Sequence, residues 1–170
     1  SLMYPIFDSR LTNITIGDNV KTIPDYAFYE CSDITSVKIP DSVTNIGNWA
    51  FDDCGGLKSV TIGSGVTSIG DGAFSHCGGL TSVVIPNSVT SIGNNAFSNC
   101  GGLTSVVIPD SITSIGNDAF SNCSKLTSAV WNAENCIREG SNDNWQIFSN
   151  CSKLTTITIG DNVKTIPAYA

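Results

Sequence analysis

One unit of sequence recurs along the whole chain. Leu80 to Gly102 reads LTSVVIPNSVTSIGNNAFSNCGG, and Leu103 to Lys125 reads LTSVVIPDSITSIGNDAFSNCSK. The leading residue of the unit returns with spacings of 23 five times and then 28, as Leu11, Ile34, Leu57, Leu80, Leu103, Leu126 and Leu154. A fixed period of this length is the signature of a solenoid, because one unit cannot bury its apolar residues without stacked neighbours. We predict a single solenoid domain over residues 1–170, with six to seven coils, one long coil at 126–153, and the character of a fragment of a longer array.

The apolar residues within a unit predict its local structure. With the leading Leu as position 1, positions 4 and 6 are apolar and alternate with polar neighbours, which is typical of a strand with one buried face. Proline or glycine at position 7 ends this strand, and a second extended piece such as Val89 to Ile92 runs on the opposite side of the coil. The segment NNAFSN has room for one helical turn. Stacking then aligns the strands as a parallel sheet and aligns one phenylalanine per coil in the interior.

The repeated pattern LxxVxIPxSVTxIGxxAFxxC resembles the bacterial leucine-rich repeats called BspA-like, or Treponema pallidum-type, over nearly the whole chain. The resemblance implies a right-handed leucine-rich-repeat solenoid of the α/β repeat class, dominated by strands, with a parallel sheet on one face. It also implies a bacterial protein that is secreted or held at the cell surface, and some relatives bind fibronectin or fibrinogen. The family has no catalytic residues to carry over, so we expect a protein that is not an enzyme.

Charge and hydropathy restrict the partners. The formal net charge is -7 and the isoelectric point is ≈ 4.3, which argues against nucleic acid and anionic membranes, since both require clustered basic residues. No apolar run approaches the ~20 residues that cross a bilayer, so we expect no membrane insertion. We expect a monomer that binds a protein or another macromolecule, with extracellular-matrix proteins among the candidates.

Six of the seven cysteines occupy position 21 of their coils, namely Cys31, Cys54, Cys77, Cys100, Cys123 and Cys151. Equivalent side chains of stacked coils run parallel at about 4.8 Å, whereas a disulfide requires Cβ atoms ~3.8 Å apart. We therefore predict buried thiols that fill the interior. Cys136 lies outside this row and is the thiol that we expect to be reactive, unless the insertion around it buries it.

Other polar residues offer little chemistry in the sequence alone. His76 sits at position 20, where other coils have Asp53 and Asn99, and is predicted to be a solvated turn residue. The pairs Asp52-Asp53 and Asp25/Glu30 lack the fixed spacing of a calcium loop. We expect no metal ion and no cofactor.

The outer face of the predicted sheet carries Val84, Val107 and Val130 in a row otherwise made of threonine and lysine. An exposed apolar stripe on an uncharged sheet is a candidate contact surface. The alternative interpretation is that β-branched residues simply favour strands.

The long coil supplies further candidates. Leu11 to Ala27 matches Leu154 to Ala170 at 15 of 17 positions, an offset of 143 residues, which indicates a larger repeat that contains one long coil. Trp131 falls at position 6 and should point inward. The polar run Arg138 to Asn144 should bulge as a mobile loop, and Trp145 should lie on the surface. Arg138 and Trp145 therefore join the three valines as candidate binding residues.

Three functions are compatible with these features. The first is a non-catalytic, adhesin-like interaction module of a bacterial surface protein, which binds a host or bacterial macromolecule. The second is a structural spacer without a ligand. The third is ice binding through rows of serine and threonine, which the valines interrupt.

Overall fold

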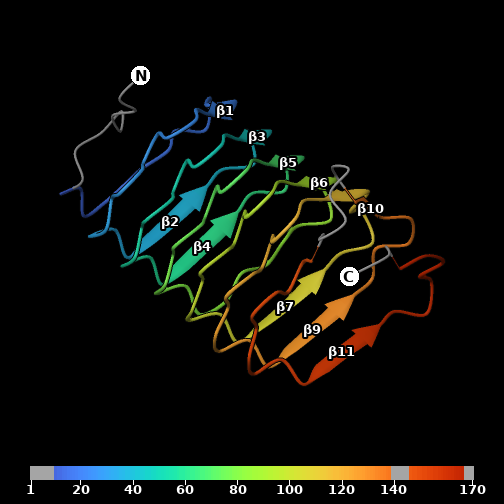
Figure 1. Ribbon diagram of the computed structural model, residues 1–170. Coiled ribbons are helices and arrows are strands. Elements are labelled where there is room, and N and C mark those ends of the chain that lie inside the picture. The colour runs from blue at the N-terminus through green and yellow to red at the C-terminus, as the bar shows by residue number, and fades with distance from the viewer. Residues whose placement is uncertain (1–9, 139–145, 167–170) are drawn as a thin grey trace.

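The computed structural model describes residues 10–138 and 146–166. These residues wind as a stack of coils, and every strand pairs in parallel with the equivalent strand of a neighbouring coil (Figure 1). The predicted solenoid is confirmed. The strands are β1 Thr22–Ile23, β2 Ser36–Ile39, β3 Asn45–Ile46, β4 Ser59–Ile62, β5 Ser68–Ile69, β6 Ser91–Ile92, β7 Ser105–Ile108, β8 Ser114–Ile115, β9 Ser128–Trp131, β10 Ile137–Arg138 and β11 Thr156–Ile159. The described part of the chain contains no helix that could span a membrane.

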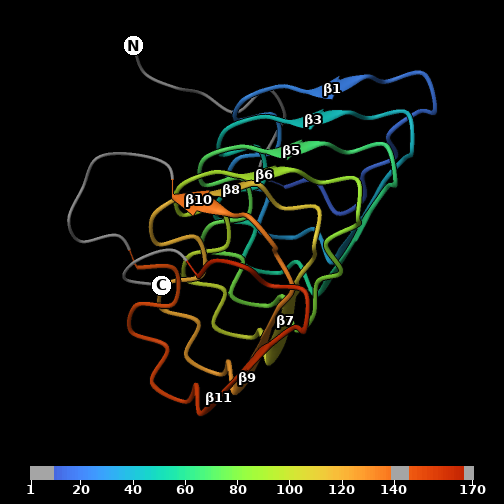
Figure 2. The ribbon, with the colours of Figure 1, turned by 90° about the vertical axis from the view of Figure 1, so that its right-hand side faces the viewer.

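Two rows of strands run along the stack on different sides of the coils (Figure 2). Two-residue strands form a six-stranded sheet in the order β1-β3-β5-β6-β8-β10. Four-residue strands form the other row, in which outward and inward residues alternate as predicted. In β7, for example, Val106 and Ile108 are buried while Ser105 and Val107 are exposed.

The row of four-residue strands is interrupted in its middle. It consists of a pair, β2-β4, and a three-stranded sheet, β11-β9-β7. Between them, a single bridge joins Ser59 to Ser82, and Val83 to Ile85 form no strand. Ser82 to Ile85 reads SVVI, as β7 does, so local sequence preference does not decide the interruption.

Phenylalanine rings fill the interior as a continuous stack. Phe28, Phe51, Phe74, Phe97, Phe120 and Phe148 follow one another with ring centroids 5.1 to 5.8 Å apart. The rings from Phe51 to Phe120 have no exposed surface. Parallel stacking at this distance is possible because successive coils are near-copies displaced along one axis, so each ring depends on the coils on both sides for its burial.

The corner that contains the phenylalanine is not helical, so the prediction of one helical turn is wrong. Positions 16 and 20 of the coils have left-handed backbone, with φ from 49° to 60°, as at Trp49 and Asp53. The N–H groups of the corner alternate in direction: that of Phe51 donates to the carbonyl of Ala73 in the next coil, at 2.8 Å, whereas that of Asp52 donates within the segment to Trp49, at 3.3 Å. A continuous helix would bond only within the segment, whereas every second N–H of this corner contributes to a further ladder between coils.

Glycine at position 14 is required by close contact between coils. A Cβ atom on Gly47, Gly70, Gly93 or Gly116 would lie 2.3 to 2.8 Å from backbone atoms of the preceding coil, closer than any ordinary contact. Next to these glycines, the Oδ1 atoms of Asp71 and Asn94 accept backbone N–H bonds from the following coil, at 2.7 and 2.8 Å. The corner thus packs backbone against backbone.

The long coil accommodates a larger side chain inside. Trp131 is 3% exposed, pairs in register with Ile108, and donates from Nε1 to the carbonyl of Ala133 at 3.2 Å. This confirms its predicted inward direction. Cys136 is also buried, which agrees with the second of the two expectations for this thiol, burial by the insertion. The repeat register resumes at Ile147, whose carbonyl accepts the N–H of Phe120.

The cysteine row is buried, and none of the seven cysteines, all of which lie in described residues, forms a disulfide. Each thiol from Cys54 to Cys123 donates to the carbonyl of a phenylalanine in the preceding coil; Cys77, for example, donates to Phe51 at 3.2 Å. Burial raises the pKa of Cys54 and of Cys100 to about 12, and it raises that of Cys77 as well. Thiolate, the reactive form, is therefore scarce at these three cysteines at neutral pH. At the end of the row, a hydrogen bond with the Cys123 thiol lowers the pKa of Cys151 to about 7.

We predict that Phe97→Ala lowers the free energy of unfolding by about 3 to 5 kcal/mol, because both neighbouring rings lose contacts. Ser105→Ala, on the exposed side of β7, should change it by less than about 0.5 kcal/mol. Urea unfolding of the two variants measures the difference, and equal midpoints would show that Phe97 is not part of the core.

We also predict that a disulfide-reactive reagent titrates 7 thiols in denatured protein without reductant, and one or none within minutes in native protein. Cys54, Cys77 and Cys100 should stay unreactive from pH 7 to pH 9, because their raised pKa values lie above this range; a single native thiol that reacts should be Cys151, whose pKa is lowered to about 7. A denatured count below seven would mean that disulfides exist.

Candidate functional site

The valine face is the outer side of the four-residue strand row at Val84, Val107 and Val130. Val84 is 78% exposed and Val107 is 49% exposed, while Val130 is half-buried. Val107 and Val130 are register partners in β7 and β9. Large exposed apolar side chains on neighbouring coils form a continuous contact surface rather than isolated exposures.

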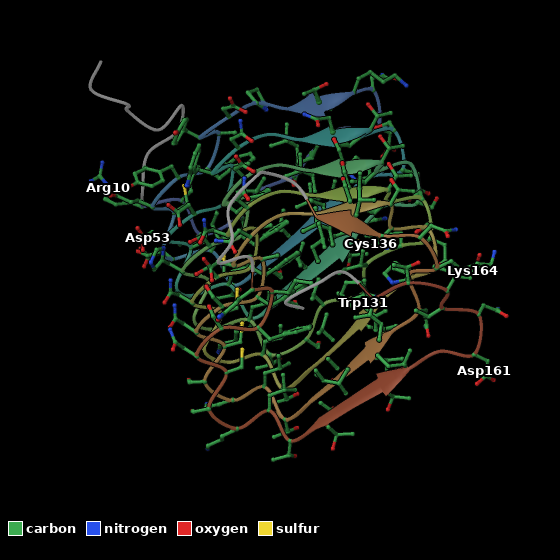
Figure 3. The ribbon with its side chains drawn as sticks, turned by 45° about the vertical axis from the view of Figure 1, so that its right-hand side comes forward. Arg10, Asp53, Trp131, Cys136, Asp161 and Lys164 are labelled. Carbon is green, nitrogen blue, oxygen red and sulfur yellow. The ribbon has the colours of Figure 1, made fainter. Side chains whose placement is uncertain are left out.

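A groove of ≈ 530 Å³ runs along one border of this face. Val84 and Val107 line it, and Val130 does not. The other side of the groove is formed where the strands give way to turns, at Asn87, Asp110, Asn132 and Asp161. Figure 3 shows Asp161 at this border, beyond the end of β11. The groove therefore crosses several coils, so a ligand in it would contact several repeats at once.

The lining of the groove supplies groups that can bind a ligand. It combines apolar side chains with amides and two carboxylates. The amides and carboxylates supply hydrogen bonds and negative charge. The arrangement fits a ligand with apolar groups beside hydrogen-bond donors.

Of the five residues that the sequence proposed as one binding set, the structure places the backbone of Arg138 away from the three valines. The backbone of Arg138 pairs with Ile115 in the six-stranded sheet, which lies on a different side of the coil from the valine face. Arg138 therefore belongs to β10 and does not begin a bulge, which corrects the predicted start of the loop. Trp145 and the predicted loop residues 139–144 lie outside the described residues.

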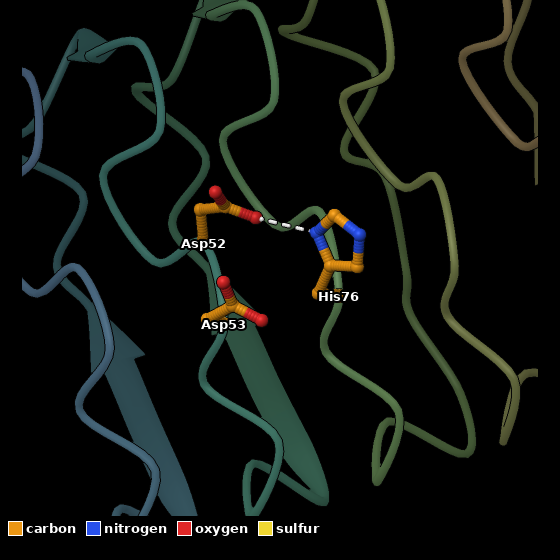
Figure 4. A group of neighbouring side chains, drawn as sticks. All are labelled: Asp52, Asp53 and His76. Atoms are coloured by element: carbon orange, nitrogen blue, oxygen red, sulfur yellow. Dashed lines mark hydrogen bonds and ion pairs between the residues drawn. The ribbon is translucent and has the colours of Figure 1, made fainter.

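A second candidate lies at the corner, where Asp52, Asp53 and His76 come together (Figure 4). The Nδ1 atom of His76 is 3.0 Å from Oδ1 of Asp52, and half of the His76 side chain is exposed. The prediction of a solvated turn residue missed these contacts. A signal was present, because Asp53 and His76 occupy position 20 of adjacent coils and Asp52 comes directly before.

Comparison with protein-family models matches the chain to the family described as "BspA type Leucine rich repeat region", in 6 copies, over residues 6–127 and 140–170. Comparison with curated proteins found no match. The family match agrees with the 23-residue period and with the solenoid geometry.

Solved structures give the same result. A Treponema pallidum leucine-rich-repeat protein, TpLRR, is 32% identical with a TM-score of 0.73; the match covers 88% of this chain and 64% of that one. A leucine-rich cell surface protein from Faecalibacterium prausnitzii is 30% identical with a TM-score of 0.68, covering 90% of this chain and 34% of that one. The chain thus spans less than two thirds of either relative. With the family model covering most of its residues, the chain belongs to the BspA-type leucine-rich-repeat family.

Proposed function

We propose that the chain is a non-catalytic interaction module of a secreted or cell-surface bacterial protein, which binds a host or bacterial protein through the valine face and its groove. The exposure of Val84 and Val107 along one groove carries this proposal. Adhesin-like binding to an extracellular-matrix protein is the first form of the function to test.

The cellular location is inferred from relatives. The similar protein of Faecalibacterium prausnitzii is described as a leucine-rich cell surface protein, and the family is a repeat scaffold of the kind that mediates protein contacts. Because this chain spans about a third of that relative, what the complete protein binds is part of the proposal.

The groove indicates the chemistry of the partner. Val84 and Val107 supply two exposed aliphatic side chains on neighbouring coils, and Asp110 and Asp161 place two carboxylates beside them. An apolar protein segment flanked by lysine or arginine would bury the valines and pair with the carboxylates. The net charge of -7 would also steer a basic partner toward the chain.

The two other functions make different demands on the structure. A spacer requires only stacked coils, and the row of valines would then reflect the preference of β-branched residues for strands. Ice binding requires a flat, regular array, but the four-residue strand row is split between β4 and β7 and its threonines are interrupted by valines. These features favour an interaction module.

The test replaces the valines by the residue that other coils carry at this position. Val84→Thr with Val107→Thr reproduces Thr61 and Thr158, so the coil structure should be retained. We predict that binding to immobilised fibronectin, fibrinogen or another surface protein, measured by surface plasmon resonance, weakens by about tenfold or more in this double variant.

Val20→Thr is the matched control, because Val20 is an exposed valine away from the groove, and it should bind as the parent chain does. Equal loss in both variants, or unchanged binding in the double variant, would contradict a role for the valine face. Absence of saturable binding to every ligand, without thermal hysteresis, would support the spacer, and thermal hysteresis would support ice binding.

A further inference from the structure

We propose that Asp52, Asp53 and His76 form a binding site for a divalent first-row transition-metal ion of the Zn²⁺ type. Adjacent coils contribute the three side chains at one corner of the stack (Figure 4). Asp53 and Asp161 lie at opposite edges of the molecule in Figure 3, so this corner is separate from the groove. The site therefore does not depend on the proposed function.

The spacing of the ligand atoms suits a shared ion. One nitrogen or oxygen atom from each of the three side chains lies within 4.8 Å of the other two. Nδ1 of His76 and Oδ1 of Asp52 are 3.0 Å apart. Two ligands that bind one zinc ion at about 2.0–2.2 Å are separated by roughly 3 to 3.5 Å, so this pair already has the required spacing. Asp53 is exposed, and its carboxylate reaches the ion by rotation of its side chain through solvent.

Asp52 brings a carboxylate into position 19, which is also buried in the coils that carry Ser75 and Ser98. Asp52 is 7% exposed, and the carboxylate loses most of its hydration. Among the described residues its ion-pair partner is His76, whose Nδ1 atom also lies 2.9 Å from Oγ of Ser75. The two adjacent carboxylates concentrate negative charge at the corner, which a divalent cation would compensate.

The other coils show that the fold does not require these residue types here. From the coil of Ser75 onward, position 19 is serine, and from the coil of Asn99 onward, position 20 is asparagine. Ser98 and Ser121 illustrate the neutral arrangement, because their hydroxyl groups form a hydrogen bond between coils at 2.8 Å. Asp52, Asp53 and His76 replace such neutral residues at positions that meet in space. This corner thus differs from the equivalent corners of later coils because it carries side chains that can bind a metal ion.

The ligand set selects the kind of ion. Imidazole nitrogen favours zinc and neighbouring first-row metals, whereas calcium prefers six to eight oxygen ligands. Three protein ligands leave at least one position to water, so the site would be open rather than closed. Because the ligands come from two coils, a bound ion would also link those coils.

The hydrogen bonds of His76 define how metal binding changes it. The amide Nδ2 of Asn99 lies 3.2 Å from Nε2 and 2.9 Å from Oγ of Ser98, so Nε2 accepts a hydrogen bond and Nδ1 carries the proton donated to Asp52. A metal ion on Nδ1 requires that this proton move to Nε2, where the Asn99 carbonyl oxygen accepts it after the amide rotates. Metal binding at Nδ1 is therefore expected to switch the tautomer.

The experiment combines calorimetry with nitrogen NMR of the imidazole. His76 is the only histidine of the chain, so its ring signals need no assignment. We expect one Zn²⁺ per chain, a switch of the protonated ring nitrogen from Nδ1 to Nε2, and much weaker binding of Ca²⁺. His76→Asn, which reproduces Asn99 of the next coil, and Asp53→Asn should each weaken Zn²⁺ binding by roughly tenfold or more.

Glu30→Gln is the control, since Glu30 is an exposed acid at position 20 of the preceding coil and is not one of the three ligands; it should leave Zn²⁺ affinity unchanged. The proposal is overturned if Zn²⁺ shows no saturable binding up to about 1 mM, the weak limit of extracellular metal sites. It is also overturned if binding survives His76→Asn, if the tautomer does not change, or if a Co²⁺ complex shows thiolate charge transfer, which would place the ion on cysteine.

Discussion

The structure depends on the stacking of equivalent side chains in successive coils, above all on the phenylalanine rings. A ring such as Phe74 lies 5.2 and 5.3 Å from its two neighbours and contacts no water. The thiol of the adjoining cysteine bonds to a phenylalanine carbonyl of the preceding coil, and the corner backbone bonds to the following coil. The ring stack, the corner backbone and the cysteine row thus all connect adjacent coils, and the buried thiols have a structural role.

The period allowed most of the fold to be predicted from the sequence. It identified the stacked phenylalanines, the alternation within the four-residue strands and the inward direction of Trp131 because each depends only on position within the coil. The corner was predicted as one helical turn because only the residues of a single coil were considered. Its conformation depends on hydrogen bonds to the next coil, such as that of the Phe51 N–H. The interruption at Val83 to Ile85 could not be predicted locally, since the sequence SVVI that begins at Ser82 is also the sequence of β7.

For the candidate sites too, position within one coil predicted only part of what the structure shows. Position within the coil predicted the exposure of Val84 and Val107 but not the groove, which is formed with turn residues such as Asp161 of a more distant coil. It also placed Asp53 next to His76, yet it gave no reason to expect Asp52 to be buried, because that position holds serine in later coils. In a regular scaffold the exceptions are therefore informative: the valine face and the corner of Asp52, Asp53 and His76 are both places where the repeats differ.

Amide hydrogen exchange measured by NMR tests most directly whether each coil is stabilised by its neighbours. The N–H groups of Phe74 and Phe97 bond to the next coil at 2.8 and 2.7 Å inside the stack, while Phe28 lies near its end. If coils stabilise one another, the amides of Phe74 and Phe97 exchange most slowly, and protection declines gradually toward both ends of the stack. Fast exchange at Phe97 beside slow exchange at Phe28, or an abrupt change of protection between β4 and β7, would contradict the account.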